Sequence, residues 1–255
     1  MITNLHTHTP RCLHAEGAEE EYAKAAIAGG LKTLGFSDHT PQFFPGDYYS
    51  RMRMRPNELQ EYADTVLQLR KSYAGQLDIR LGLEAEYYPA LFPELISHLR
   101  DTEIEYLLLG QHWNLNEYDA PFNGTPTSNK TDLEQYCNQV IEAMYTGLFT
   151  YFAHPDLMYF VGDDGIYKQH MQRLCKAAKS CDVPLELNFL GHLANRHYPN
   201  MRFWEIAAEE NCSVVFGCDA HRPQDTVQPE TEVWALDVVQ KYGLHLLPEA
   251  PIRKL

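Results

Sequence analysis

The sequence predicts an α/β fold in which a parallel sheet lies inside and helices pack against it. Short apolar runs, typical of buried strands, alternate seven times with segments whose apolar residues recur at helical spacing. The length of 255 residues allows one large core, and no repeat, linker or low-complexity tract divides the chain. We therefore expect a single domain over residues 1–255, built as either a closed barrel or an open sheet.

The first half of the chain is expected to form four strands and three helices. Strands are expected over residues 1–5, 31–36, 78–86 and 106–109, and helices over 18–28, 56–73 and 93–100. A Gly-Gly pair ends the first helix, and Pro56 is well placed to begin the second. The second helix also has a clear apolar face, formed by Leu59, Tyr62, Ala63, Val66 and Leu67.

The second half continues the alternation. Strands are expected over 150–153, 183–188 and 213–216, and helices over 132–146, around 171–178, 203–208 and 235–242. Residues 113–130 and 189–200 are expected to be irregular loops. The segment 40–55 is rich in Pro, Gly, Tyr and Arg, and it is long enough to suggest an active-site flap.

Composition excludes several classes of partner. Apolar residues make up 44% of the chain, charged residues 22%, and the formal net charge is -14. So acidic a chain disfavours a nucleic-acid partner, because phosphate backbones are neutralised by Lys and Arg. No apolar run approaches the roughly 20 residues that cross a bilayer. No export signal is visible either, so we expect a cytoplasmic protein without a membrane partner.

Most of the histidines follow an expected strand end. Seven of the twelve do so, namely His6, His8, His14, His39, His112, His154 and His221, and Glu84 and Asp219 have similar positions. The loops after parallel strands converge on one face of a barrel, or on one edge of an open sheet, so we expect these nine side chains to meet there. Imidazole and carboxylate donors suit Zn²⁺, Mn²⁺ or Fe²⁺, and nine donors imply two or three ions.

The six cysteines add a further possibility at this site. They are scattered and form no Cys-x-x-Cys pair, which is typical of reduced thiols. Cys12 and Cys218 adjoin the histidine motifs. Thiolate ligation is one interpretation of both, but a role as small buried residues is favoured.

Seven motifs, taken in chain order, resemble those of the PHP (polymerase and histidinol phosphatase) family. They are His6-Thr-His8, His14, Asp38-His39, Gly82-Leu83-Glu84, Gln111-His112, His154-Pro155-Asp156 and Asp219-Ala220-His221. The motifs cover nearly the whole chain, and their residues are most similar to those of the histidinol-phosphate phosphatase branch. The resemblance implies a distorted (β/α)7 barrel with three divalent metal ions at the C-terminal rim of the strands.

The resemblance also assigns ligands to each ion. The first would be held by His6, His8, Glu84 and Asp219, the second by Glu84, His112 and His154, and the third by His14, His39 and His221. Three divalent ions less two carboxylates leave about +4, which attracts a phosphate dianion and activates a bridging water as a hydroxide nucleophile. Glu84 would be essential because it bridges two ions. Asp38 and Asp156 are candidates for orienting a ligand imidazole or for handling a proton.

The activity implied is hydrolysis of a phosphomonoester, a small phosphorylated metabolite, with L-histidinol phosphate the leading substrate. Related phosphatases often place an arginine shortly after the His154 motif, but residues 157–162 contain none. The candidates for substrate contact are Arg196, Arg222, Gln111, His197 and Tyr198.

Other functions stay open at this point. One is a phosphoesterase of the same family that acts on nucleotides or phosphotyrosine peptides, and another is a non-catalytic metal-binding module. An amidohydrolase-type deacetylase is disfavoured, because residues 106–112 contain no lysine that could bridge two ions.

Overall fold

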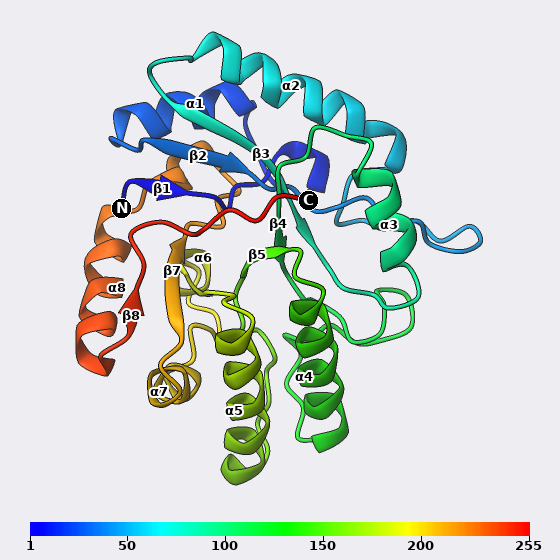
Figure 1. Cartoon of the computed structure of the whole chain (residues 1–255), viewed down its shortest axis with the longest axis vertical. Coiled ribbons are helices and arrows are strands. Elements are labelled where there is room, and N and C mark those ends of the chain that lie inside the picture. The colour runs from blue at the N-terminus through cyan, green and yellow to red at the C-terminus, as the bar shows by residue number, and fades with distance from the viewer.

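The structure is a computed structural model that describes all residues, 1–255, and it contains one sheet of eight parallel strands. The strands are β1 (Thr3–Asn4), β2 (Thr33–Phe36), β3 (Asp78–Ala85), β4 (Tyr106–Leu109), β5 (Phe149–Phe152), β6 (Leu185–Asn188), β7 (Ser213–Gly217) and β8 (His245–Leu246). Each strand pairs with the next one in sequence. The sheet curls into a half-open barrel with the helices outside it (Figure 1), which confirms the predicted α/β class.

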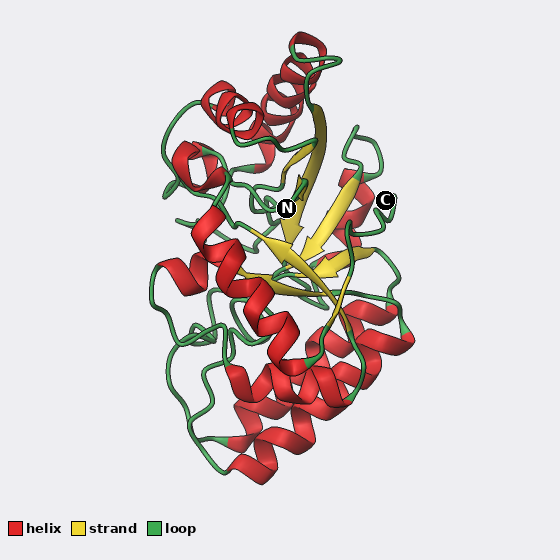
Figure 2. Ribbon diagram, turned by 90° about the vertical axis from the view of Figure 1, so that its left-hand side faces the viewer, coloured by secondary structure: helices red, strands yellow, loops and turns green.

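The chain has eight α-helices, and Figure 2 shows from the side how helices surround the strands. They are α1 (Glu19–Ala28), α2 (Leu59–Ser72), α3 (Phe92–Leu99), α4 (Lys130–Tyr145), α5 (Asp164–Ser180), α6 (Phe189–Leu193), α7 (Met201–Glu209) and α8 (Pro229–Tyr242). Short 3-10 turns, η1 (Pro10–Cys12), η2 (Pro56–Glu58) and η3 (Pro223–Thr226), precede or follow them.

Two short elements differ from the sequence-based expectation. The segment 189–200 was expected to be an irregular loop, but it begins with α6, which the Asn188 side chain caps by accepting from Gly191 N at 2.9 Å. The strand β8 was not expected at all. Elements of five and two residues are too short to show a hydrophobic period, so only their tertiary contacts reveal them.

Side chains along the strands alternate between two environments. Leu185 and Leu187 of β6 belong to the large apolar core between the sheet and the helices. Because strand side chains alternate, Glu186 and Asn188 face the opposite, inner side of the sheet. On β3, Leu83 and Ala85 lie in the helix-facing core, so Glu84 points inward.

The inner face has its own small apolar cluster, which consists of Leu5, Tyr106, Leu108, Tyr151, Ala153 and Val215. The Tyr106 hydroxyl donates to Leu5 O at 2.8 Å and so links β4 to the end of β1. Its ring lies against β2 and β3, where a Cβ on Gly35 or Gly82 would approach atoms of Tyr106 to 2.1 or 2.3 Å. The two glycines therefore make room for this ring.

The barrel closes at one end only. Beyond the strand ends, Thr7 forms a parallel bridge with Ala220, and His8 N donates to Ala220 O at 2.9 Å. At the other end β8 pairs with β7, through Ser213 and His245. Closure at the C-terminal rim and an added strand at the opposite end give the predicted distorted barrel. The closure brings the first and last histidine motifs together.

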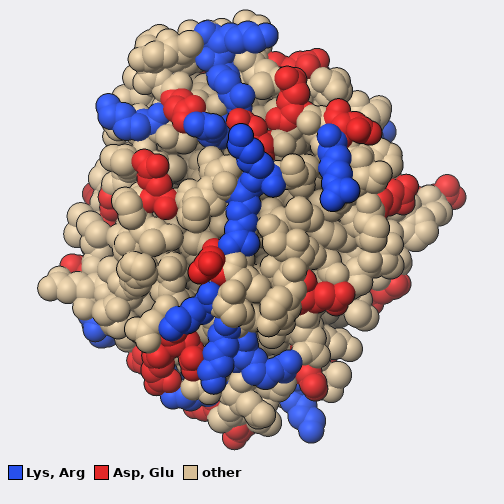
Figure 3. All heavy atoms as spheres, in the orientation of Figure 1, with Lys and Arg blue, Asp and Glu red and all other residues tan.

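The outer surface shows charges of both signs. On the face in Figure 3, Lys and Arg side chains are interspersed with Asp and Glu. None of the helices has both the length and the apolar character needed to cross a membrane.

The Gly82→Ala variant tests the packing inside the barrel. An added methyl group has to displace the buried Tyr106 ring, so we expect the free energy of unfolding to fall by about 1–3 kcal/mol. Urea unfolding monitored by circular dichroism measures this. Gly165→Ala is the control, because its Cβ meets only Asp163 Oδ1 at 3.1 Å, and an unchanged Gly82→Ala protein would contradict the packing.

Candidate metal centre

The nine predicted donor side chains gather at the C-terminal rim of the sheet. Six of the seven histidines, together with Glu84 and Asp219, lie at or just after a strand end, and His14 follows the η1 turn. Glu84 and His6 are at most 1% exposed, whereas His14 and His221 lie nearer the solvent. A cavity of about 620 Å³ opens onto this cluster.

A first group of donors surrounds the Nε2 atom of His8. His6 Nε2 and Asp219 Oδ1 both lie 3.2 Å from it, and Glu84 Oε2 lies 3.5 Å away. Donor atoms that share one tetrahedral ion, with bonds of about 2.0–2.2 Å, lie roughly 3.4 Å apart. The distances of these three side chains from His8 Nε2 are therefore close to those expected of donors that share one ion.

A second group forms around the other oxygen of Glu84. His154 Nε2 lies 2.9 Å from Glu84 Oε1, and His112 Nε2 lies 3.9 Å from the same atom. The two oxygens of one carboxylate thus face two different sets of nitrogens. This is the arrangement of a carboxylate that bridges two ions.

A third group lies toward the mouth of the cavity. His14, His39 and His221 each offer a ring nitrogen, and these atoms lie within 4.8 Å of one another. His39 also places Nδ1 2.9 Å from Glu84 Oε2, so the third group adjoins the first.

The Nδ1 contacts of the rings decide which nitrogens can bind metal. Four rings have Nδ1 within hydrogen-bond distance of an oxygen: His6 with Glu186 Oε1 at 2.8 Å, His14 with Cys12 O at 2.7 Å, His112 with Glu86 Oε1 at 3.2 Å, and His221 with Asp219 O at 2.9 Å. A ring that donates from Nδ1 keeps the lone pair of Nε2 free. That arrangement is characteristic of metal-binding histidines.

Comparisons with known proteins identify the family. A family model of the PHP domain matches residues 4–189. The chain is 31% identical over 233 residues to a probable histidinol-phosphatase of Deinococcus radiodurans, with 87% of each chain covered. The chain belongs to the PHP family. The resemblance inferred from its motifs is thereby confirmed.

One further relative and one solved structure are also similar to this chain. A probable histidinol-phosphatase of Schizosaccharomyces pombe is 25% identical over 255 residues, which cover 88% of this chain and 81% of that protein. The crystal structure of a histidinol phosphate phosphatase from Lactococcus lactis, complexed with Zn, L-histidinol and phosphate, has the same fold. Its TM-score is 0.75 at 18% identity, and the match covers 99% of this chain and 98% of that one.

Neighbouring imidazole rings favour the anionic form of the two carboxylates at the PHP site. Burial acts to raise the pKa of the Glu84 carboxyl, but the His39, His112 and His154 rings outweigh it and hold that pKa well below its usual range. Burial acts in the same way on Asp219, and there His6, His8 and His221 hold the pKa well below its usual range. Both carboxylates are therefore available as anionic ligands.

Glu186 and Asn188 support the PHP site and were not found from the sequence. Besides contacting His6, Glu186 accepts from His154 N at 3.0 Å and from Asn188 Nδ2 at 2.9 Å. Asn188 Nδ2 also lies 3.1 Å from Asp219 Oδ2. The only sequence signal for this pair is two polar residues, two positions apart, in an otherwise apolar strand.

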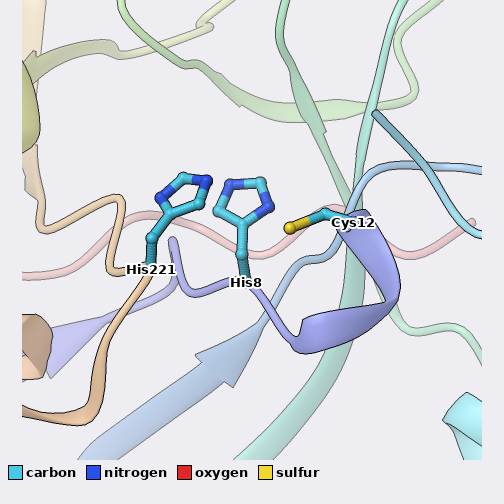
Figure 4. Close-up of side chains that lie close together, drawn as sticks. All are labelled: His8, Cys12 and His221. Atoms are coloured by element: carbon cyan, nitrogen blue, oxygen red, sulfur yellow. The ribbon is translucent and has the colours of Figure 1, made fainter. Parts of the chain in front are cut away.

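The two cysteines near the site differ in what their thiols contact. Figure 4 shows the Cys12 thiol facing the His8 ring, and its Sγ atom lies within 4.8 Å of a nitrogen of His8 and of His221. Cys218 instead directs its thiol to Thr226 O, at 3.2 Å. Cys12 is therefore an additional candidate donor, whereas Cys218 is a buried structural thiol.

The two candidate aspartates have different surroundings. Asp38 accepts from His39 N at 2.7 Å and lies 3.5 Å from His8 Nδ1, so it is placed to orient a ligand ring. Asp156 accepts from Asn200 N at 2.5 Å and from Trp204 Nε1 at 3.1 Å, and burial raises its pKa to about 7. Asp156 thus anchors the start of α7 and not a ligand imidazole, whereas the alternative role in handling a proton stays a prediction.

Three of the five candidate substrate residues line the cavity, namely Arg196, His197 and Tyr198. The other two have partners elsewhere, which corrects the expectation for them. Gln111 is fully buried, where it donates to Trp113 O at 2.7 Å and accepts from Tyr87 N at 3.1 Å. The Arg222 side chain points to Asp225, three residues later, at 2.8 Å.

The Glu186→Gln variant tests the support of the His6 ring. Both Glu186 oxygens accept from N–H donors, so an amide nitrogen in their place faces a donor and weakens the hold on His6. We expect divalent metal affinity to fall by about 10- to 100-fold, measured by calorimetric titration of metal-free protein. Glu209→Gln, at a surface ion pair with Lys168, is the control, and equal affinities in both variants would refute this role.

Proposed function

We propose that this protein is a metal-dependent phosphatase that converts L-histidinol phosphate and water to L-histidinol and phosphate. The observation that carries the proposal is the set of nine donors around Glu84, in which four rings present Nε2 to the site. The names of the curated relatives, probable histidinol-phosphatase, agree with it.

The donor set fits three divalent ions. His6, His8, Glu84 and Asp219 would hold the first, Glu84, His112 and His154 the second, and His14, His39 and His221 the third. Imidazole and carboxylate donors of this kind suit Zn, Mn or Fe better than Ca or Mg. When bound, such ions supply charge neutralisation for the phosphate oxygens and lower the pKa of water from about 15.7 towards about 7.

Arg196 is the cationic side chain best placed to bind the phosphate of the substrate. Of the residues that line the cavity, it alone is a lysine or arginine. Its Nη1 donates to the Tyr198 hydroxyl at 2.6 Å, so the guanidinium is held in one position at the cavity wall. An arginine in a fixed orientation can present two parallel N–H groups to a phosphate.

The rest of the cavity fits a small molecule with a flat ring. Met52, Trp113, Phe122 and Leu190 form an apolar wall beside the metal ligands. At about 620 Å³ the cavity is in the ordinary range for a metabolite site, roughly 300–1,000 Å³. A phosphate bound near the donors would leave the imidazole of histidinol next to this wall.

Phosphate release from a panel of substrates tests the proposed reaction. Purified, metal-loaded protein is assayed with L-histidinol phosphate, nucleotide monophosphates and a phosphotyrosine peptide, and we expect a clear preference for the first. Preference for a nucleotide or a peptide would refute the substrate, and no turnover on any of them would favour a binding module.

In Glu84→Gln, which lacks the anionic bridge, we expect kcat to fall by at least about 10²–10³-fold.

A separate variant tests the phosphate contact. In Arg196→Met we expect KM for L-histidinol phosphate to rise by about 10-fold or more, because a charge-assisted bond to phosphate contributes about 1.5–3 kcal/mol. Steady-state kinetics measure the change. Arg222→Met is the matched control, since that side chain pairs with Asp225 outside the cavity, and equal effects would contradict the assignment.

A further inference from the structure

The flap over residues 40–55 and one of the ligand histidines share a buried carboxylate, that of Glu86. Arg53 is 2% exposed, and its Nη2 lies 2.8 Å from Glu86 Oε1. The same oxygen lies 3.2 Å from His112 Nδ1, while the other oxygen of Glu86 accepts from the Tyr88 hydroxyl. Because a guanidinium and an imidazole meet at one oxygen, moving Arg53 moves the group that orients His112.

Arg53 also holds a second loop. Its Nη2 lies 2.7 Å from Glu117 Oε2, and its Nε donates to the same oxygen at 2.9 Å. Glu117 belongs to the segment between β4 and α4, which supplies Trp113 and Phe122 to the cavity wall. A further bond, from Nη1 to Thr40 O at 3.1 Å, ties the guanidinium to its own flap.

We infer that Arg53 is a positioning residue that fixes His112 and the apolar wall of the cavity at the same time. It does so by holding Glu86 as the acceptor for His112 and Glu117 as the anchor of the wall. The inference rests on the proposed function, in which His112 is a metal ligand.

The chemistry of the cluster supports arginine in this position. Two carboxylates that are at most 4% exposed need a shared cation, because an unpaired buried charge is strongly destabilising. The planar fork of arginine donates in several directions at once, whereas lysine offers a single point charge. Lysine can therefore restore the charge at position 53 without restoring all of the contacts.

Metal binding to metal-free variants separates a positioning role from a merely structural one. In Arg53→Met we expect one divalent ion to bind about 10- to 100-fold more weakly in a Zn²⁺ or Mn²⁺ titration, and in Arg53→Lys an intermediate loss. Arg55→Met is the matched control, because its exposed guanidinium lies over the Tyr49 ring, and we expect unchanged affinities. A folded Arg53→Met protein with wild-type affinities for all its ions would overturn the inference.

The Glu117→Gln variant loosens the wall and leaves the contact between Glu86 and His112 in place. We expect faster amide hydrogen exchange over residues 113–129, with metal affinity unchanged. An affinity loss equal to that of the Arg53 variants would overturn the assignment to Glu86. Should Arg53→Met fail to fold, Arg53→Lys and Glu117→Gln still decide the matter.

Measurements on the wild type separate a failure of the Arg53 inference from a failure of the proposed function. If it hydrolyses L-histidinol phosphate while the Arg53 variants bind metal normally, this inference fails and the proposed function stands. If the wild type binds no divalent ion, both fail.

Discussion

The buried carboxylate of Glu84 sets the requirements that the rest of the site meets. Its two oxygens face ring nitrogens from several strand ends, among them those of His8, His39 and His154. Burying anionic carboxylates and imidazole lone pairs together is costly unless cations pair with them. Divalent ions meet that requirement, because one ion accepts several nitrogen and oxygen donors at once. The requirement that buried donors pair with cations explains the charge, the burial and the orientation of the surrounding side chains together.

Parallel topology makes this assembly possible. Strands β1 to β7 run in the same direction, so the residues that follow each strand reach one rim. The bridge between Thr7 and Ala220 then joins the two ends of the sheet at that rim. Without it, His6 and Asp219, which come from opposite ends of the chain, would belong to separate edges. The opposite end of the barrel carries β8 and contributes no donor.

The side chains that contact the candidate metal ligands are packed as tightly as the candidate ligands themselves. Glu186 accepts from the His6 ring and Glu86 from the His112 ring, both candidate ligands, and both glutamates are fully buried. Close backbone positions make room for such side chains: a Cβ at Gly217 would lie 1.7 Å from Glu186 Oε1, and one at Gly110 would lie 1.9 Å from Glu84 Oε1. The glycines are needed here for space, which explains small residues beside large carboxylates on the inner face of the barrel.

The sequence by itself determined the seven main strands, most of the helices and the nine donors at strand ends, because hydrophobic period and motif spacing are local properties. From the sequence we expected Gln111 and Arg222 to contact substrate, because they adjoin candidate ligand histidines. In the structure each side chain instead bonds to a residue close in the chain, Gln111 to Trp113 and Arg222 to Asp225. Only the tertiary structure revealed the contacts of Glu186 and Arg53 near the site. A glutamate in an apolar strand, or an arginine in a loop, acquires its function from partners that folding brings near, and local sequence carries no record of those contacts.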